Sequence, residues 1–243
     1  MCSKKQVLIK FRNDVICTFI FFPASRNISM LLINVLLLFG ATVIADCPDT
    51  FGNGAVIDAS VKGDAQLVQC LLSKGGKLNS QGKNGNTALM WAVSRGHGKT
   101  IDLLLERGAT LDTHNKAGAT ALIMAADNGD TLTTQRLVDL GAQLNLQDVD
   151  GNTALIRACL GGHFDVVASL VNKGALMDVQ NRDGITALMY SIQWDQKRLA
   201  LALVDQGARL DLVDIYNRNA LSWAQLFGRS ELADYIMHKL SYS

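Results

Sequence analysis

The residues of this sequence that could perform acid–base or metal chemistry are few, and they do not gather at ligand spacings. The four histidines stand at positions 97, 114, 163 and 238, and the carboxylates are scattered through loop-like segments. None of the patterns HExxH, CxxC, GxSxG or a phosphate-binding loop occurs, although such spacing is what brings metal ligands or a nucleophile and its base together. We therefore expect no enzymatic activity, no metal site and no cofactor.

The overall charge argues against nucleic acid as the main partner. The chain has 243 residues, of which 49% are hydrophobic and 19% charged, with a net charge of +1. Residues 1–29 hold five basic residues against one acidic, a net of +4, which leaves 18 basic and 21 acidic residues, a net of −3, for the remainder. Phosphate binding needs clustered lysine and arginine, and the body of the chain has no such cluster.

The N-terminal stretch has the order of a secretory signal. Basic residues precede the uncharged run ISMLLINVLLLFGATVIA at 28–45, and Val43 and Ala45 suit the two small positions before a cleavage site. The run is near the lower length limit for crossing a bilayer, so an uncleaved anchor is the main alternative, and Met30 as the true start is another. Signal and anchor both leave the body from Asp46 onward outside the cytoplasm, because positive charge stays inside.

Three cysteines belong to this exported body. Cys159 follows Ala158 at a position that calls for a small buried residue, so we expect a packed free thiol there. Cys47 and Cys70 could pair in an oxidising compartment and staple the N-terminal end, a question that the sequence leaves open.

The body from Asp46 to the end repeats itself every 33 residues. The phase is marked by Thr87, Thr120, Thr153 and Thr186, with a leucine two residues after each and a glycine near each unit's end. The units are 51–83, 84–116, 117–149, 150–182, 183–215 and 216–243. Such self-similarity indicates a stacked array in one domain, 46–243, preceded by the signal or anchor at 1–45.

Each unit reads as two helices and a loop. Threonine caps the first helix, and small residues such as Ala92 and Ala125 let that helix pack closely. A glycine such as Gly96 ends it, a second helix with apolar residues at helical spacing follows, and a hairpin-like loop leads to the next threonine. His97 and His163 follow such glycines, which favours a structural role in capping the turn.

At this point the sequence resembles the ankyrin-repeat family, over about 190 residues. The 33-residue period, the GxTAL start, the Gly-His or Gly-Asp turn and the Gly-Ala helix end carry the resemblance. It implies an all-α solenoid of helix–turn–helix units. The family's Thr-Pro-Leu-His motif is altered here, with alanine in the proline place and Met90, Ile123, Ile156 or Met189 in the histidine place. Because that histidine ties loops together in the family, we expect less rigid loops.

Positions that vary between units define the candidate binding surface. In the family these positions face the concave groove, one after the Thr-Ala-Leu-x motif and two before the helix-ending glycine. The candidates are Trp91, Arg95, Met124, Arg157, Tyr190, Trp194, Trp223 and Phe227. Aromatic residues there could fill gaps between helices. They could also form a recognition surface, because tryptophan, tyrosine and arginine carry binding energy at interfaces, and the set as a whole favours this reading.

The expected function is therefore that of a non-enzymatic, monomeric module that binds a protein partner through its groove and loop tips. The chain is similar to small exported bacterial ankyrin proteins, which implies a periplasmic location. A secreted effector acting on host proteins is the leading alternative, and a small-ligand or cofactor carrier using the aromatic groove is another. Contact with a membrane is expected only through an uncleaved N-terminal segment.

Overall fold

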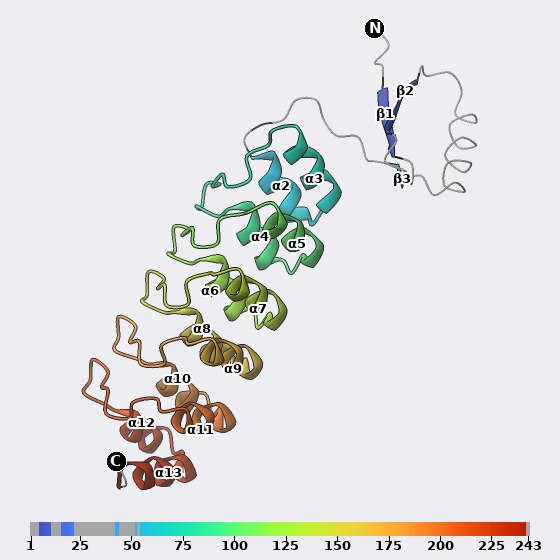
Figure 1. The fold of residues 1–243 in the computed structure, drawn as a ribbon. Helices are drawn as coiled ribbons and strands as arrows, with labels where there is room; N and C mark the ends of the chain where they lie inside the picture. Colours follow the sequence, from blue (N-terminus) through green and yellow to red (C-terminus); the bar gives the residue numbers. More distant parts are fainter. Residues whose placement is uncertain (1–4, 11–15, 22–41, 44–51, 53, 242–243) are drawn as a thin grey trace.

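The structure is a computed structural model that describes residues 5–10, 16–21, 42–43, 52 and 54–241. Over 54–241 it is an array of helix pairs stacked in chain order, with a hairpin-like loop projecting to one side between successive pairs (Figure 1). This confirms the all-α solenoid. The pairs are α2 (Ala55–Lys62) with α3 (Ala65–Ser73), α4 (Ala88–Ser94) with α5 (Gly98–Glu106), α6 (Ala121–Asp127) with α7 (Thr131–Asp139), α8 (Ala154–Gly161) with α9 (Phe164–Asn172), α10 (Ala187–Gln193) with α11 (Lys197–Asp205), and α12 (Ala220–Leu226) with α13 (Ser230–Ser241).

Three short strands precede the array. β1 (Lys5–Lys10) pairs antiparallel with both β2 (Ile16–Phe21) and β3 (Thr42–Val43), in the order β2-β1-β3. Most of the run at 28–45 lies outside the described residues, so its role as signal or anchor stays a prediction. In the part of the chain that is described, no helix combines the length and the apolar character needed to cross a membrane.

The first helix of each pair, called the inner helix, begins where the sequence predicts. The threonine Oγ1 atoms of Thr87, Thr120, Thr153 and Thr186 each accept a hydrogen bond from the backbone N–H three residues later, at 3.3 Å. In the last pair the side chain of Asn219 does the same for the N–H of Ser222. These bonds satisfy one of the donors that a helix start leaves unpaired, which confirms the predicted caps.

The inner helices end in a left-handed residue. Gly96, Gly129 and Gly162 have φ of 69°, 72° and 72°, a region that glycine enters without steric cost. In the fifth pair Asp195 occupies this place with φ of 58°, and no glycine is present there. The turn geometry is thus kept by the stack even where the sequence departs from the pattern.

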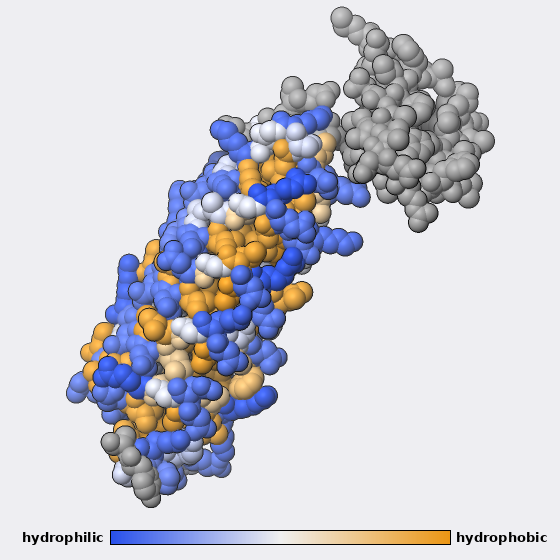
Figure 2. All heavy atoms as spheres, in the orientation of Figure 1, coloured by the Kyte–Doolittle hydropathy of each residue, from blue (hydrophilic) through white to orange (hydrophobic). Residues whose placement is uncertain are grey.

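The core lies between the stacked helices and is continuous along the array. The inner-helix residues Leu89, Leu122, Leu155 and Leu188 are fully buried, as are Met90, Ile123, Ile156 and Met189 at the altered family position. Figure 2 shows hydrophobic residues gathered over the helices and hydrophilic ones over much of the loop side. Apolar burial between neighbours is what stabilises an array of this kind.

The third unit carries polar atoms into this core. Thr133 and Thr134 of α7 are buried where α9 has Val166 and Val167. The Oγ1 atom of Thr134 has no hydrogen-bond partner within the described residues. An unsatisfied buried hydroxyl costs stability, so this unit is locally weak.

The cysteines take two different states. Cys159 is a fully buried free thiol, as predicted, and burial raises the pKa of that thiol. Cys70 is disulfide-bonded. Cys47, its predicted partner, lies outside the described residues.

Candidate functional site

The hairpin-like loops are held by one repeated side chain. Asn115, Asp148, Asn181 and Asp214 occupy equivalent positions, and each Oδ1 accepts hydrogen bonds from two backbone N–H groups, two and four residues later, at 2.9 to 3.0 Å. Aspartate and asparagine side chains stabilise turns in this way. We call these four residues the loop anchors.

Neighbouring loops are also bonded to one another. The Gln147 Nε2 atom donates to the carbonyl oxygens of Gly151 at 2.6 Å and of Gln180, one unit further on, at 3.2 Å. Backbone hydrogen bonds also join neighbouring loops, as from the Val149 N–H to the carbonyl of Ala117 in the preceding loop at 3.0 Å. A Cβ atom at Gly118 would lie 2.7 Å from the Val149 nitrogen, so glycine lets the loops pack this closely. These contacts tie the loops together in place of the family histidine, and the expectation of less rigid loops stays a prediction.

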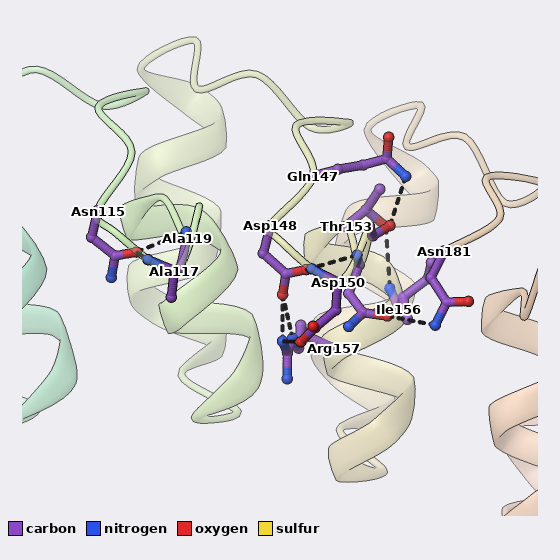
Figure 3. Close-up of polar contacts among 12 residues, drawn as sticks. Asn115, Ala117, Ala119, Gln147, Asp148, Asp150, Thr153, Ile156, Arg157 and Asn181 are labelled. Carbon is purple, nitrogen blue, oxygen red and sulfur yellow. Dashed lines mark hydrogen bonds and ion pairs between the residues drawn. The ribbon is translucent and has the colours of Figure 1, made fainter. Parts of the chain in front are cut away.

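The variable inner-helix positions bond to these anchors. Arg157 lies nine residues after Asp148, and its Nε donates to the Asp148 carboxylate at 2.8 Å while its guanidinium also pairs with Asp150 (Figure 3). At the same spacing, the Asn181 Nδ2 donates to the Tyr190 hydroxyl at 3.1 Å. The Trp223 Nε1 donates to Asp214 at 2.9 Å.

This bonding corrects one predicted binding residue and shows that two others also contact the loops. Trp223 is only 3% exposed, so the prediction that it faces a partner is wrong, and its role is to fill the space between helix and loop. The Arg157 side chain is 27% exposed, but its guanidinium compensates Asp148, whose side chain is 2% exposed. Tyr190 is half-buried, and burial raises the pKa of its phenol.

The other predicted residues remain at the surface to different degrees. Trp91 and Met124 are partly buried against the core, and the Arg95 guanidinium lies 6.0 Å from the Trp91 ring centre. Trp194 is 58% exposed at the end of α10. Phe227 is half-buried, with its ring centre 5.5 Å from that of Trp223. Trp194 and Arg95 are thus the predicted residues most open to a partner.

Sequence reasoning missed several exposed apolar side chains near these residues. Leu226, beside Phe227, is 57% exposed. Ile215 and Tyr216, at the tip of the last described loop, are 61% and 71% exposed. The signal was present in the sequence, because most of the equivalent loop positions in other units are polar, Val149 and Ala117 being the exceptions.

His97 and His163 connect units instead of forming a reactive pair. The His97 ring nitrogen lies 3.1 Å from the Val61 carbonyl oxygen, and that of His163 lies 3.0 Å from the Asp127 carbonyl oxygen. Neither side chain caps the helix that it precedes. They therefore cap the last turn of the preceding unit's inner helix. Over the described part of the chain, no group of three or more histidine, cysteine or carboxylate residues could hold a metal ion.

Comparisons with known proteins agree with this architecture. The family model for ankyrin repeats in three copies matches residues 22–115 and 108–181. The crystal structure of EF0377, an ankyrin repeat protein, superposes with a TM-score of 0.72 at 26% sequence identity, covering 78% of this chain and 98% of that one. No curated protein matches the sequence.

Proposed function

Because the chain belongs to the ankyrin-repeat family, whose repeats are generally protein–protein interaction modules and typically non-enzymatic, we propose that this array binds a protein partner. The binding surface consists of the inner-helix ends and the loop tips along the concave groove. Trp194 carries the proposal, since it is more than half exposed at a place where the earlier units have Lys62, Arg95, Asn128 or Gly161. Large exposed aromatic side chains of this kind supply much of the binding energy at interfaces.

The hydrogen bonds within and between the loops also support the proposal. Anchors, glutamines and backbone bonds hold each loop to its own unit and to the next one. A surface fixed in this way loses little conformational entropy on binding, which favours affinity.

In-cell crosslinking followed by affinity capture tests the proposal. The wild-type chain should retain a protein partner that a Trp194→Ala/Leu226→Ala variant loses. Leu140→Ala is the matched control, because Leu140 is 56% exposed, close to the 57% of Leu226, and follows the far end of α7. Equal capture by all three chains, or loss in the control alone, would contradict the proposed surface.

We also propose that the array works outside the cytoplasm, in the periplasm or as a secreted protein. The signal-like run at 28–45 and the disulfide at Cys70 support this location, because disulfides persist in oxidising compartments. N-terminal sequencing of the mature protein should then begin at or near Asp46, and cell fractionation separates the periplasmic from the secreted form. An intact Met1 on protein recovered from the cytoplasm would contradict export.

A further inference from the structure

We propose that the partner of this surface is a basic protein segment anchored by a large apolar side chain, an inference that rests on the proposed function. The apolar anchor would lie on Trp194 and Leu226. The cationic side chain would lie beside it, over carboxylates of the third to fifth units.

The apolar half of this surface lies at the ends of consecutive inner helices. Leu160, Trp194 and Leu226 come from α8, α10 and α12, which pack against one another in order. Packed helices lie about 8–10 Å apart, so one extended segment can reach two of these ends. More than half of the Trp194 and Leu226 side chains is exposed, and Phe227 packs beside them against the core.

The acidic half lies next to it. Asp127 is the last residue of α6 and occupies the same row of helix ends, one unit before Leu160. Asp150 and Asp183 stand at the tips of the next two loops, and both are exposed. None of these carboxylates except Asp150 makes an ion pair within the described residues.

The cations nearby do not neutralise this surface: Arg229, which donates to the carbonyl of Gln193 just before Trp194, is itself paired with Asp195. Arg157 is already paired with Asp148 and Asp150, and Arg182 shares a loop tip with Asp183. Four carboxylates, those of Asp127, Asp148, Asp150 and Asp183, against two guanidinium groups leave a net charge of −2. A partner cation would therefore gain from this surface, whereas a partner carboxylate would be repelled.

The charges of these carboxylates shift the pKa values of two inner-helix side chains, Arg157 and Tyr190. Burial alone would lower the pKa of Arg157. The hydrogen bond and the charge of Asp148, together with the charges of Asp127 and Asp150, outweigh burial and raise that pKa. Burial raises the pKa of Tyr190, and the charges of Asp183 and Asp150 add to the shift. The three exposed carboxylates thus act on the two side chains between them.

The other end of the row has the opposite character. Lys62 and Arg95 are exposed at the ends of α2 and α4, the positions that Trp194 and Phe227 occupy in later units. Asp127 stands one unit from Arg95, whereas Asp183 belongs to the same unit as Trp194, so the acidic surface lies between the basic and the apolar ends of the row. A segment bound across the later units must present its cation and its apolar anchor close together.

Binding of short fluorescent peptides to the full chain, followed by anisotropy, tests the inference. The probes are an alternating Lys/Leu peptide, an alternating Glu/Leu peptide and an alternating Lys/Ser peptide of equal length. The Lys/Leu peptide should bind about tenfold or more tightly than either of the others, because only it offers both features. Trp194→Ala should weaken its binding about tenfold, as loss of a central aromatic does.

Charge variants separate the acidic surface from general attraction. Asp127→Asn/Asp183→Asn should weaken Lys/Leu binding about three- to tenfold and reduce its dependence on salt. Glu106→Gln, an exposed carboxylate on α5, is the control and should leave binding unchanged. Equal binding of the Lys/Leu and Glu/Leu peptides, or an equal effect of the control, would overturn the inference.

The proposed function can survive that result. A partner captured by the wild-type chain and by Asp127→Asn/Asp183→Asn, but lost with Trp194→Ala/Leu226→Ala, leaves protein binding in place and overturns the basic segment. Absence of both peptide binding and crosslinked capture overturns both.

Discussion

At the scale of single residues, the contact between Arg157 and Asp148 shows how a variable position serves the fold. The Asp148 side chain is buried, and its charge is compensated by Arg157 and by the N–H groups of Asp150 and Asn152. A buried carboxylate that loses its cation is strongly destabilising. The pair is therefore a structural contact, because removing Arg157 would leave the Asp148 carboxylate buried without its cation.

Replacing Arg157 with alanine should lower the free energy of unfolding by about 1–3 kcal/mol, less than for a fully buried pair because Arg157 is partly exposed. Urea denaturation measures the change. Arg182→Ala, an exposed arginine at a loop tip, should change stability by less than about 0.5 kcal/mol. An equally small effect of Arg157→Ala would show that water, not arginine, compensates Asp148.

Thr134→Val should raise the free energy of unfolding by about 1 kcal/mol, because it removes a buried hydroxyl that has no partner in the described structure. Val167, the equivalent residue in α9, shows that the stack accommodates valine there. Thermal or urea unfolding gives the value. A destabilised variant would mean that an ordered water satisfies the hydroxyl.

Much at this scale could be predicted from the sequence, and the failures have a common physical cause. The threonine caps and the buried Cys159 follow from local chemistry and helical period. The burial of Trp223 depends instead on a bond to Asp214, in a loop that a helix-by-helix reading treats separately. The nine-residue spacing between Asp214 and Trp223 can be read from the sequence, but it indicates a contact only when the loop and the helix are considered together.

At the scale of elements, the loops hold the buried carboxylates of the described residues, Asp148 and Asp214. Asp214 accepts hydrogen bonds from two backbone N–H groups, from Trp223 and from Arg218. Burial alone would raise the pKa of Asp214, but these hydrogen bonds, that of Arg218 foremost, hold it below its ordinary value of 3.8. The sequence indicated the loops, but it could not indicate which charges they bury.

The lowered pKa of Asp214 makes the last loop a source of acid sensitivity. A depressed folded-state pKa gives stability that is present above the unfolded value of 3.8 and is lost as pH falls through the lower folded value. Asp214→Asn should therefore cost stability at pH 7, and the difference from wild type should shrink toward about pH 2. Urea midpoints across this range measure it, and a difference independent of pH would contradict the assignment.

At the scale of the whole molecule, stability comes from contacts between neighbouring units. Leu155 is buried in α8, a helix in the middle of the stack that packs against both α6 and α10. Arrays of this kind couple their units through such interfaces. The period and the helical spacing predicted the stacked helix pairs, because these recur in every unit, but they did not predict the strands β1 to β3.

Leu155→Ala should lower the free energy of unfolding by about 2–5 kcal/mol, as expected when a fully buried leucine leaves a cavity. Chemical denaturation followed by circular dichroism gives the value. Leu176→Ala, which shortens an exposed loop leucine, should stay within about 0.5 kcal/mol of wild type. Comparable losses in the two variants would contradict the register of the stack.

The bond between a loop anchor and the residue nine positions later has a consequence for module exchange. The 33-residue units divide the chain between 149 and 150, and this division separates Asp148 from Arg157. A chimeric array joined there would combine an anchor from one parent with a helix residue from another, for example aspartate with tyrosine. The exchangeable module therefore starts at the anchor, as in 148–180 or 181–213, so that donor and acceptor are inherited together.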